Sequence, residues 1–311
     1  MIYKKYLLIP ILFLALAFIE AGWSEDETAT NYYLIQPPPG TVKIAKNFYC
    51  DQTEVGNIHW REYLYWEERV FGKNSKEYLA ALPDTTVWLK QGPCFNELYA
   101  DYLRTRYYDQ YPLVGISQKQ ATDFAKWRSD RAFERQLIEL HKLSENQHQT
   151  RENHFTIESY FNGTYKSILP GKKVSYYPEY RLPDVQERVL ILYYADSVNK
   201  AYFDNCDKAN CKQCKAHNYN LQAEISPCKS YFVISEPTRN ISDPICAAKN
   251  DNAIYNLRGN VSEWGFEPGI AFGGGWIDTK ERIAKSDTFQ INTPNAWTGF
   301  RNICEWKKWK E

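Results

Sequence analysis

Hydrophobic positions recur along this chain in short blocks of changing period, which predicts helices and strands mixed along the sequence. A proline-glycine turn precedes residues 42–45, which have the pattern of a strand. Between residues 54 and 72 the apolar positions fall at helical spacing and predict an amphipathic helix that ends at a glycine. Residues 111–116 form a short apolar run that is typical of a buried strand.

The middle of the chain predicts two further helices around a polar stretch. Ser117, with Gln120 three residues later, has the pattern of a capping box and predicts a helix over 118–132. Residues 133–180 are polar and predict an extension of that helix followed by a long surface insertion. Pro183 leads into a predicted helix over 184–194.

The last part of the chain changes character again. From residue 256 onward, short apolar blocks alternate with glycines, which predicts short strands joined by turns. The whole pattern predicts an α+β fold with limited regular secondary structure and long loops. We expect one domain over 33–306 with the insertion at 133–180, a flexible start at 22–32 and a tail at 307–311.

Composition limits the classes of partner. The chain has 311 residues with 38 basic and 38 acidic side chains, a net charge of zero that favours neither nucleic acid nor an anionic membrane surface. This length is ample for a large hydrophobic core.

The N-terminus resembles an export signal. Lys4 and Lys5 precede an apolar run over 7–19, and Ala21 is a plausible cleavage position, so residues 1–21 are expected to form a signal peptide. The run is shorter than the roughly 20 residues of a membrane span. The alternative is an uncleaved signal anchor. We expect the protein to associate with a membrane only through such an anchor or through a membrane-bound partner. We therefore expect an exported protein in the periplasm, at the outer membrane or on the cell surface.

The cysteines fit an exported protein, because an even number in an oxidising compartment favours disulfides. The eight are Cys50, Cys94, Cys206, Cys211, Cys214, Cys228, Cys246 and Cys304. Their pairing cannot be deduced from the sequence. Two alternatives for the central cluster are a zinc site that includes His217 and a redox pair at Cys211 and Cys214.

Six ordered motifs give this chain a resemblance to a known family. The segment 255–264 reads YNLRGNVSEW and is followed by GGGW at 273–276 and GFR at 299–301. Earlier segments read DQTEVGN at 51–57, YPLVGIS at 111–117 and RLP at 181–183. Together they resemble the formylglycine-generating enzymes, or sulfatase-modifying factors, and imply that family's fold, which is related to the C-type lectins.

A subgroup of that family is more similar still. The segments WREYLYW at 60–66, PDTTVW at 83–88 and KWRSDR at 126–131 resemble gliding-motility lipoproteins of the type IX secretion system, which are envelope proteins of Bacteroidetes. This chain departs from them because no cysteine follows the apolar run for lipid attachment.

The resemblance implies a copper chemistry for which this chain lacks the ligands. The family enzymes hold Cu(I) with two cysteines in the arrangement GGSxxCxxxxC, because two thiolates suit a soft ion. Here Gly275 stands at the serine position, Asp278 at the first cysteine and Ile283 at the second. We therefore expect neither catalytic residues nor copper. The HxxxHxE set of iron-dependent relatives does not occur among the five histidines either.

The resemblance also implies a structural calcium site. Asn256 and Glu263 would supply side-chain oxygens, and Gly259 and Val261 would supply backbone carbonyls, which are the hard ligands that Ca²⁺ takes. The alternative is that Asn256 caps the turn while Glu263 pairs with a nearby cation such as Arg301.

Three functions are consistent with these observations. We expect a non-catalytic exported scaffold or interaction protein, associated with gliding motility or type IX secretion, which holds a protein partner in the envelope. The first alternative is a metal-dependent enzyme of different chemistry on the same fold. The second is a calcium-dependent module that binds sugar or peptide.

Overall fold

The computed structural model describes residues 36–171, 174–205 and 252–310, except the side chains of residues 94, 199–205 and 280. The predicted signal peptide, the flexible start and Cys206, Cys211, Cys214, Cys228 and Cys246 lie outside these residues. The described helices and strands all belong to the compact unit from Pro37 onward. Among the described residues, no helix is long and apolar enough to cross a membrane.

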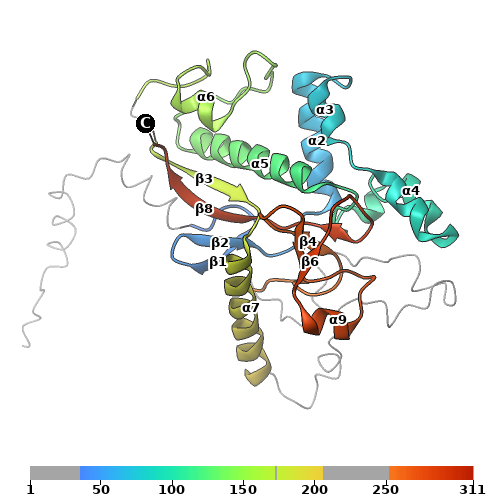
Figure 1. Cartoon of the computed structure of the whole chain (residues 1–311). Helices are drawn as coiled ribbons and strands as arrows, with labels where there is room; N and C mark the ends of the chain where they lie inside the picture. Colours follow the sequence, from blue (N-terminus) through green and yellow to red (C-terminus); the bar gives the residue numbers. More distant parts are fainter. Residues whose placement is uncertain (1–35, 172–173, 206–251, 311) are drawn as a thin grey trace, which may run out of the picture. The chain divides into compact units, whose positions relative to one another are not determined.

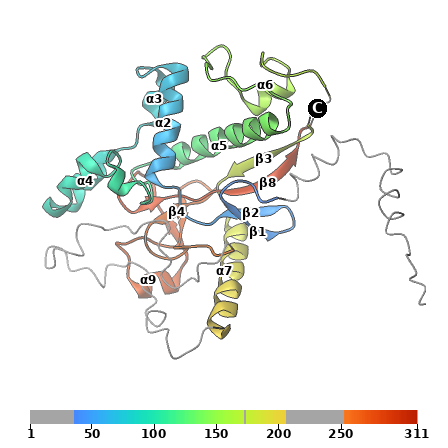
Figure 2. The same cartoon turned by 180° about the vertical axis from the view of Figure 1, so that it is seen from behind.

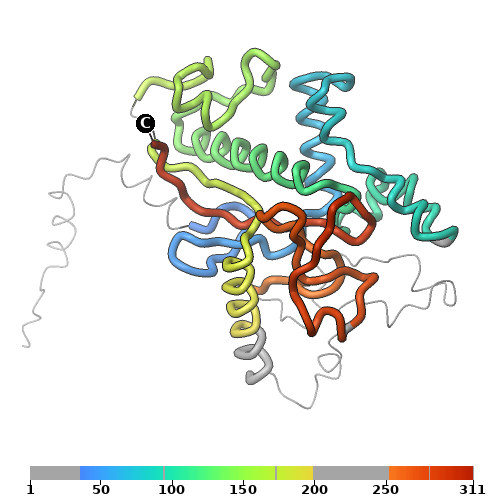
Figure 3. Tube along the Cα trace, viewed as in Figure 1, coloured from blue at the N-terminus to red at the C-terminus, as the bar shows by residue number. Residues whose placement is uncertain are grey.

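Within the described residues, two four-stranded sheets form the frame. The first has the order β1-β2-β8-β3 and is antiparallel throughout. Its strands are β1 (Thr41–Ala45), β2 (Phe48–Asp51), β3 (Tyr176–Arg181) and β8 (Ile303–Lys308). Strand β8 lies between β2 and β3, so the C-terminal strand is hydrogen-bonded to strands from the start and from the middle of the domain. Figure 3 shows this red C-terminal strand beside the blue N-terminal ones.

The second sheet is smaller and is built from the glycine-rich end of the chain. It has the order β6-β5-β4-β7, with β4 and β7 parallel. Its strands are β4 (Ser262–Trp264), β5 (Ile270–Phe272), β6 (Thr288–Gln290) and β7 (Thr298–Gly299). The short strands and turns expected after residue 256 are thus confirmed.

The three long helices agree with the sequence pattern in place, although not always in length. They are α2 (Asn57–Phe71), α5 (Gln118–Glu139) and α7 (Val185–Asn205). The predicted capping box begins α5, because Ser117 Oγ accepts from the backbone of Gln120 and the Gln120 side chain accepts from Ser117 N–H. Helices α5 and α7 lie on opposite sides of the first sheet (Figures 1 and 2), with α5 against β3 and α7 against β1.

Short helices fill the connections. The α-helical ones are α3 (Lys76–Ala81), α4 (Asn96–Asp101), α6 (Ile157–Phe161) and α9 (Lys280–Lys285). The 3₁₀ helices are η2 (Thr85–Gln91), η3 (Pro93–Phe95) and η4 (Arg106–Tyr108). With the two sheets, these elements confirm an α+β fold with long loops.

Two details of the prediction were wrong. Residues 111–116 are buried, but they form a single bridge, Gly56 to Pro112, rather than a strand. Their backbone instead forms hydrogen bonds with loops: Leu113 N–H donates to the carbonyl of Val55, and Gly115 N–H donates to the carbonyl of Asn295.

The second error concerns the insertion at 133–180, which is more than a surface loop. Its apolar side chains form a separate buried cluster against the end of α5. The cluster contains Phe133, Leu137, Leu143, Phe155, Ile157, Tyr160, Tyr165 and Val174. Phe133 and Leu137 lie on the predicted extension of the helix, whereas the cluster residues from Phe155 to Val174 follow no helical or strand period that would mark them as core.

Candidate functional site

The glycine-tryptophan segment after β5 forms a tight turn that only glycines allow. Gly273 has φ +82° and Gly274 has φ +65°, in the left-handed region that favours glycine. A β-carbon on Gly273 would lie 2.4 Å from the carbonyl oxygen of Leu257, and one on Gly275 would lie 2.7 Å from that of Trp297. The turn is therefore pressed against the backbone of the 256–263 loop and of the segment before β7.

Asp278 stabilises this turn. Its Oδ2 accepts from Gly275 N–H at 2.8 Å, and its Oδ1 lies 2.5 Å from Arg282 Nη1. The side chain is 3% exposed. One oxygen is thus hydrogen-bonded to the turn, and the other forms an ion pair with α9.

Ile283 has a packing role beside the same turn. It lies on α9 and forms a small buried cluster with Phe289, against which Ile291 packs. A β-carbon on Gly274 would lie 2.7 Å from Ile283 Cγ1, so the isoleucine fills the space over the turn. An isoleucine side chain offers no metal ligand.

A cleft of about 580 Å³ opens beside this turn. Asp278, Arg282, Asn295 and Trp297 are among the residues that line it. No cysteine is among its lining residues, all of which lie in the described ranges. The cleft can offer a carboxylate, a guanidinium, amides and aromatic rings, which are groups that suit reversible binding.

The described thiols lie elsewhere, and they correct one prediction. Cys50 and Cys304 are buried free cysteines, so the expected disulfides do not involve them. In the register of β2 and β8, Cys50 pairs with Ile303 and Cys304 pairs with Tyr49. Side chains alternate along a strand, so the two thiols point to opposite faces of the sheet and cannot join each other. Burial raises the pKa of the Cys50 thiol to about 12, which keeps it protonated.

The 256–263 loop is held by a buried ion network centred on Glu263. Arg301 donates to Glu263 Oε1 from Nε at 2.8 Å and from Nη2 at 2.7 Å. Arg188 Nη1 donates to Glu263 Oε2 at 2.9 Å. All three side chains are 2% exposed or less. Glu263 therefore has a guanidinium on each oxygen.

Arg188 extends this network to the loop backbone and to the second sheet. Its Nε donates to Asp287 at 2.8 Å, and its Nη2 donates to the carbonyl of Leu257. Arg188 was not among the predicted site residues, because a charged residue within the predicted helix over 184–194 gives no local sign of its distant partners.

Glu54 closes the loop from the other side. Its carboxylate accepts from Asn260 Nδ2 at 2.8 Å and from Asn256 Nδ2 at 3.3 Å. Asn260 has φ 60° and Asn256 has φ 55°, both in the left-handed region. In this loop conformation their amides face Glu54. Burial, with Glu263 nearby, raises the pKa of Glu54 to about 7 despite the attraction of Arg301.

These contacts do not fit a calcium ion bound through Glu263. Asn256 does offer a buried Oδ1 without a hydrogen-bond partner. Both Glu263 oxygens, however, face arginine, and a guanidinium already contacts the Leu257 carbonyl. The geometry instead agrees with the alternative pairing of Glu263 with Arg301, and the calcium site stays a prediction. Among the described residues, no group of three or more His, Cys, Asp or Glu side chains could hold a metal ion.

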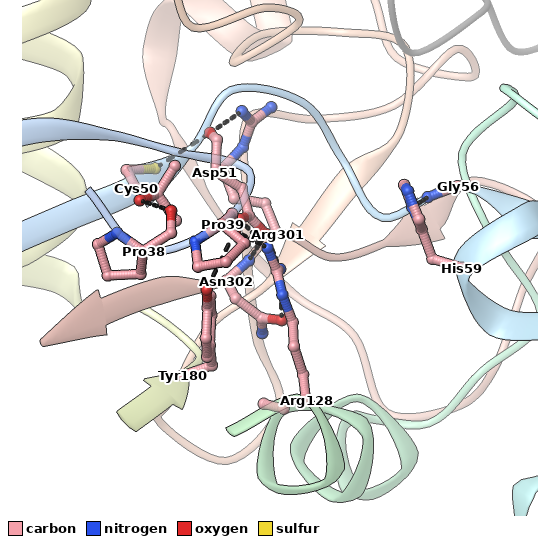
Figure 4. Close-up of polar contacts among 12 residues, drawn as sticks. Pro38, Pro39, Cys50, Asp51, Gly56, His59, Arg128, Tyr180, Arg301 and Asn302 are labelled. Atoms are coloured by element: carbon pink, nitrogen blue, oxygen red, sulfur yellow. Dashed lines mark hydrogen bonds and ion pairs between the residues drawn. The ribbon is translucent and has the colours of Figure 1, made fainter. Parts of the chain in front are cut away.

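A second buried network joins the two ends of the domain (Figure 4). Arg128 donates to both oxygens of Asp51 at 2.6 and 2.8 Å, and Asn302 N–H donates to the same carboxylate at 3.0 Å. The guanidinium of Arg128 lies over the ring of Tyr180, 4.1 Å from its centroid. Arg301 Nη1 donates to the Asp51 carbonyl at 2.9 Å and so links the two networks.

The motifs from both ends of the chain thus meet in one place, through Asp51, Glu54, Glu263 and Arg301. Figure 4 also shows His59 Nδ1 facing the N–H of Gly56, 3.1 Å away, where α2 begins. The fold and these contacts define an α+β domain. Its sequence motifs hold the loops in place through buried contacts rather than form an exposed set of reactive groups.

Comparison with known proteins names the family. A family model described as the sulfatase-modifying factor enzyme 1-like domain matches residues 15–306, and the chain belongs to this family. Among solved structures, the chain is similar to the crystal structure of CarF, with 17% identity and a TM-score of 0.40 over 83% of this chain and 86% of that one. A search of curated proteins found no match. The family expected from the motifs is confirmed, whereas the gliding-motility subgroup stays a prediction.

Proposed function

We propose that this protein is a non-catalytic interaction protein that keeps the family fold without the copper chemistry. One observation carries the proposal: Asp278 and Ile283 stand at the two cysteine positions and are both used in structural contacts. A carboxylate bound by Gly275 and Arg282 and a packed isoleucine cannot supply two soft ligands for Cu(I).

The test is a direct assay for aldehyde formation. The purified protein is incubated with Cu(I), oxygen and a cysteine-containing peptide, with a family enzyme as the positive control. Mass spectrometry of the peptide should show no conversion of cysteine to formylglycine. Conversion above the level of copper alone would overturn the proposal.

The place of action is proposed on the sequence pattern. The chain is exported through its N-terminal segment, acts in the periplasm, at the outer membrane or on the cell surface, and holds a protein partner there. Fractionation of the native cell, with sequencing of the mature N-terminus, tests this. A protein that stays in the cytoplasm with residues 1–21 intact would contradict it.

The gliding-motility and type IX secretion role is the finer part of the proposal. Its support is the likeness of three segments, at 60–66, 83–88 and 126–131, to lipoproteins of that system. Several of these residues are internal: Trp60 and Trp88 are buried, and Arg128 binds Asp51. The segments therefore support shared architecture, and purification of the protein with its partners from the envelope is the decisive test of the role.

Binding in the cleft beside Asp278 is the second candidate function. A volume of about 580 Å³ with a carboxylate, a guanidinium and amides suits a small polar ligand such as a sugar or a peptide end. A glycan and peptide array, run with and without calcium, tests this module. An Arg282→Ala variant that retains all binding would remove the cleft from the explanation.

A further inference from the structure

A second cleft, of about 520 Å³, lies far from the glycine-tryptophan turn in the sequence and uses none of its residues. It is formed by α2, α3 and α5, which are neighbours in Figure 1, and by the loop at 154–156. Neither the family motifs nor the proposed function assigns it a role.

Its walls are aromatic. The rings of Trp66 and Trp127 lie 6.5 Å apart, Tyr63 lies 5.2 Å from Trp127, and Phe71 lies 5.6 Å from Trp66. His154 adds an edge 5.1 Å from Phe71. Aromatic faces attract an organic cation, and two of these rings already have one: the guanidinium of Arg131 lies 4.7 Å from the Trp66 centroid, and that of Arg151 lies 5.0 Å from the Phe71 centroid.

A carboxylate without a cationic partner also lines the cleft. Glu67 is 6% exposed, and its Oε2 has no hydrogen-bond partner. The Tyr63 hydroxyl and, less strongly, the charge of Arg131 favour its ionised form. Among the described residues, no lysine or arginine forms an ion pair with Glu67. A buried charge of this kind is costly unless something pairs with it.

Two neighbouring carboxylates are held by cations. Glu77 accepts two hydrogen bonds from Arg151, at 2.8 and 3.0 Å, and Asp123 pairs with Lys119 at 2.6 Å. Asp130 Oδ1 accepts from the backbone N–H of Ile157 at 2.8 Å. Glu67 differs from Glu77 and Asp123 because it has no ion-pair partner among the described residues and has a buried oxygen without a hydrogen bond.

Two indole groups of the cleft are also unpaired. The Nε1–H groups of Trp66 and Trp127 are buried, and no described residue accepts from either. An ammonium or guanidinium group has no acceptor atom, so these donors do not select a cation, and the group that selects one is the Glu67 carboxylate.

We propose that this cleft binds the end of a lysine-like or arginine-like chain, an alkylammonium or alkylguanidinium group, with Glu67 as the counter-ion and Tyr63 and Trp127 as the walls. The alkyl part contacts the rings, and the cation pairs with Glu67 Oε2. An inorganic cation fits less well, because no group of three or more metal-ligating side chains occurs among the described residues. The proposal does not depend on the absence of copper chemistry.

Titration of Glu67 gives the site a pH signature. Burial, then the charge of Glu77, raises the pKa of Glu67 to about 7. The charged or titratable groups around it come from all the packed elements: Tyr63 on α2, Lys76 and Glu77 on α3, Lys119, Asp123, Lys126, Asp130 and Arg131 on α5, and His154. A cation binds the ionised carboxylate, so its affinity should rise between pH 6 and pH 8.

The test uses simple probes on the full chain. Butylammonium and butylguanidinium chloride are titrated against tryptophan fluorescence at constant ionic strength, with neutral butanol as the comparison. We expect saturable binding of the two cations, with at least tenfold weaker binding of butanol. Equal binding of butanol, or no saturable binding of either cation to the folded protein, would overturn the proposal.

Two variants locate the site. Glu67→Gln should weaken cation binding tenfold or more and remove its pH dependence. Glu68→Gln makes the same change on the same helix outside the cleft and should leave binding unchanged. If the Glu67→Gln variant does not fold, the test is the pH dependence of butylammonium binding to the unmodified protein. An affinity for butylammonium that does not change from pH 6 to pH 8 would contradict the proposal.

The source of the cation is settled by a further comparison. A short peptide with one central lysine is measured beside free butylammonium. Tighter binding of the peptide would identify a side chain of a partner polypeptide, whereas tighter binding of butylammonium would identify a free amine. Displacement of bound butylammonium by a neutral monosaccharide would show a sugar site instead and overturn the proposal.

Discussion

At the scale of residues, the loop at 256–263 is held by paired charges that are almost completely buried. Glu263 binds Arg188 and Arg301, and Glu54 binds the amides of Asn256 and Asn260. Buried ion pairs add little to the free energy of unfolding compared with apolar side chains of the same size. Removing one partner is costly, however, because it leaves the other charge buried and unpaired. The network thus specifies one loop conformation more than it adds to stability.

Removing the central charge should therefore be costly. Glu263→Gln leaves two buried guanidinium groups without their carboxylate and should lower the free energy of unfolding by about 3–5 kcal/mol. Urea unfolding followed by tryptophan fluorescence measures the change. The matched control is Glu139→Gln, which removes an exposed partner of Arg135 and should cost about 0.5 kcal/mol or less. Equal effects of the two changes would contradict a structural role for Glu263.

Glu54 should make stability depend on pH. Its pKa rises from 4.5 to about 7 on folding, so the folded chain holds this proton more tightly than the unfolded chain. Its contribution is complete below pH 4.5 and is lost as the pH rises to about 7. Urea midpoints from pH 5 to pH 8 should fall, and less steeply in Glu54→Gln. The pKa of Glu67 is raised in the same direction, so the urea midpoint of the Glu54→Gln variant should still fall in part as the pH rises.

At the scale of elements, the register between β2 and β8 decides the state of two cysteines. Cys50 faces the cluster that α7 covers, together with Val42, Ile191 and Ile303. Cys304 lies one position along β8 from Ile303 and so points to the other face, toward α5. A one-residue change of register would have placed both thiols on one side.

Free thiols in this sheet can be counted chemically. Alkylation without reductant should leave Cys50 and Cys304 unmodified in the native protein, because both thiols are buried and their pKa values are raised. After denaturation both should react, and peptide mapping by mass spectrometry should find the adduct on each. Either residue recovered as a disulfide would contradict the structure.

At the scale of the whole molecule, the motifs that identify the family converge because the first sheet places the chain's end between its beginning and its middle. Asp51, Glu54, Glu263 and Arg301 come from segments up to 250 residues apart. Arg188, from the start of α7, adds a guanidinium to the loop for which the family resemblance implies calcium.

Calcium should therefore have little effect on the stability of the domain. A thermal unfolding scan with excess chelator and one with millimolar calcium should give the same midpoint, since Glu263 is already neutralised by two arginines. An Arg188→Met variant frees one oxygen of Glu263 and is the informative comparison. A midpoint that rises with calcium in the unmodified chain would restore the calcium site.

The sequence by itself determined the three long helices, the glycine turns and the family, because these depend on local periodicity and on short motifs. Ser117 with Gln120 began α5 as predicted, and the segments at 255–264, 273–276 and 299–301 identified the fold. The absence of cysteine at positions 278 and 283 could likewise be read directly.

Only the tertiary structure decided which partner each buried polar group has. It paired Glu263 with Arg188 and Arg301, turned Cys50 and Cys304 to opposite faces of a sheet, and enclosed Glu67 between aromatic side chains. The physical reason is that burial and ion pairing depend on distances between segments far apart in the chain, which a local pattern of residues does not contain.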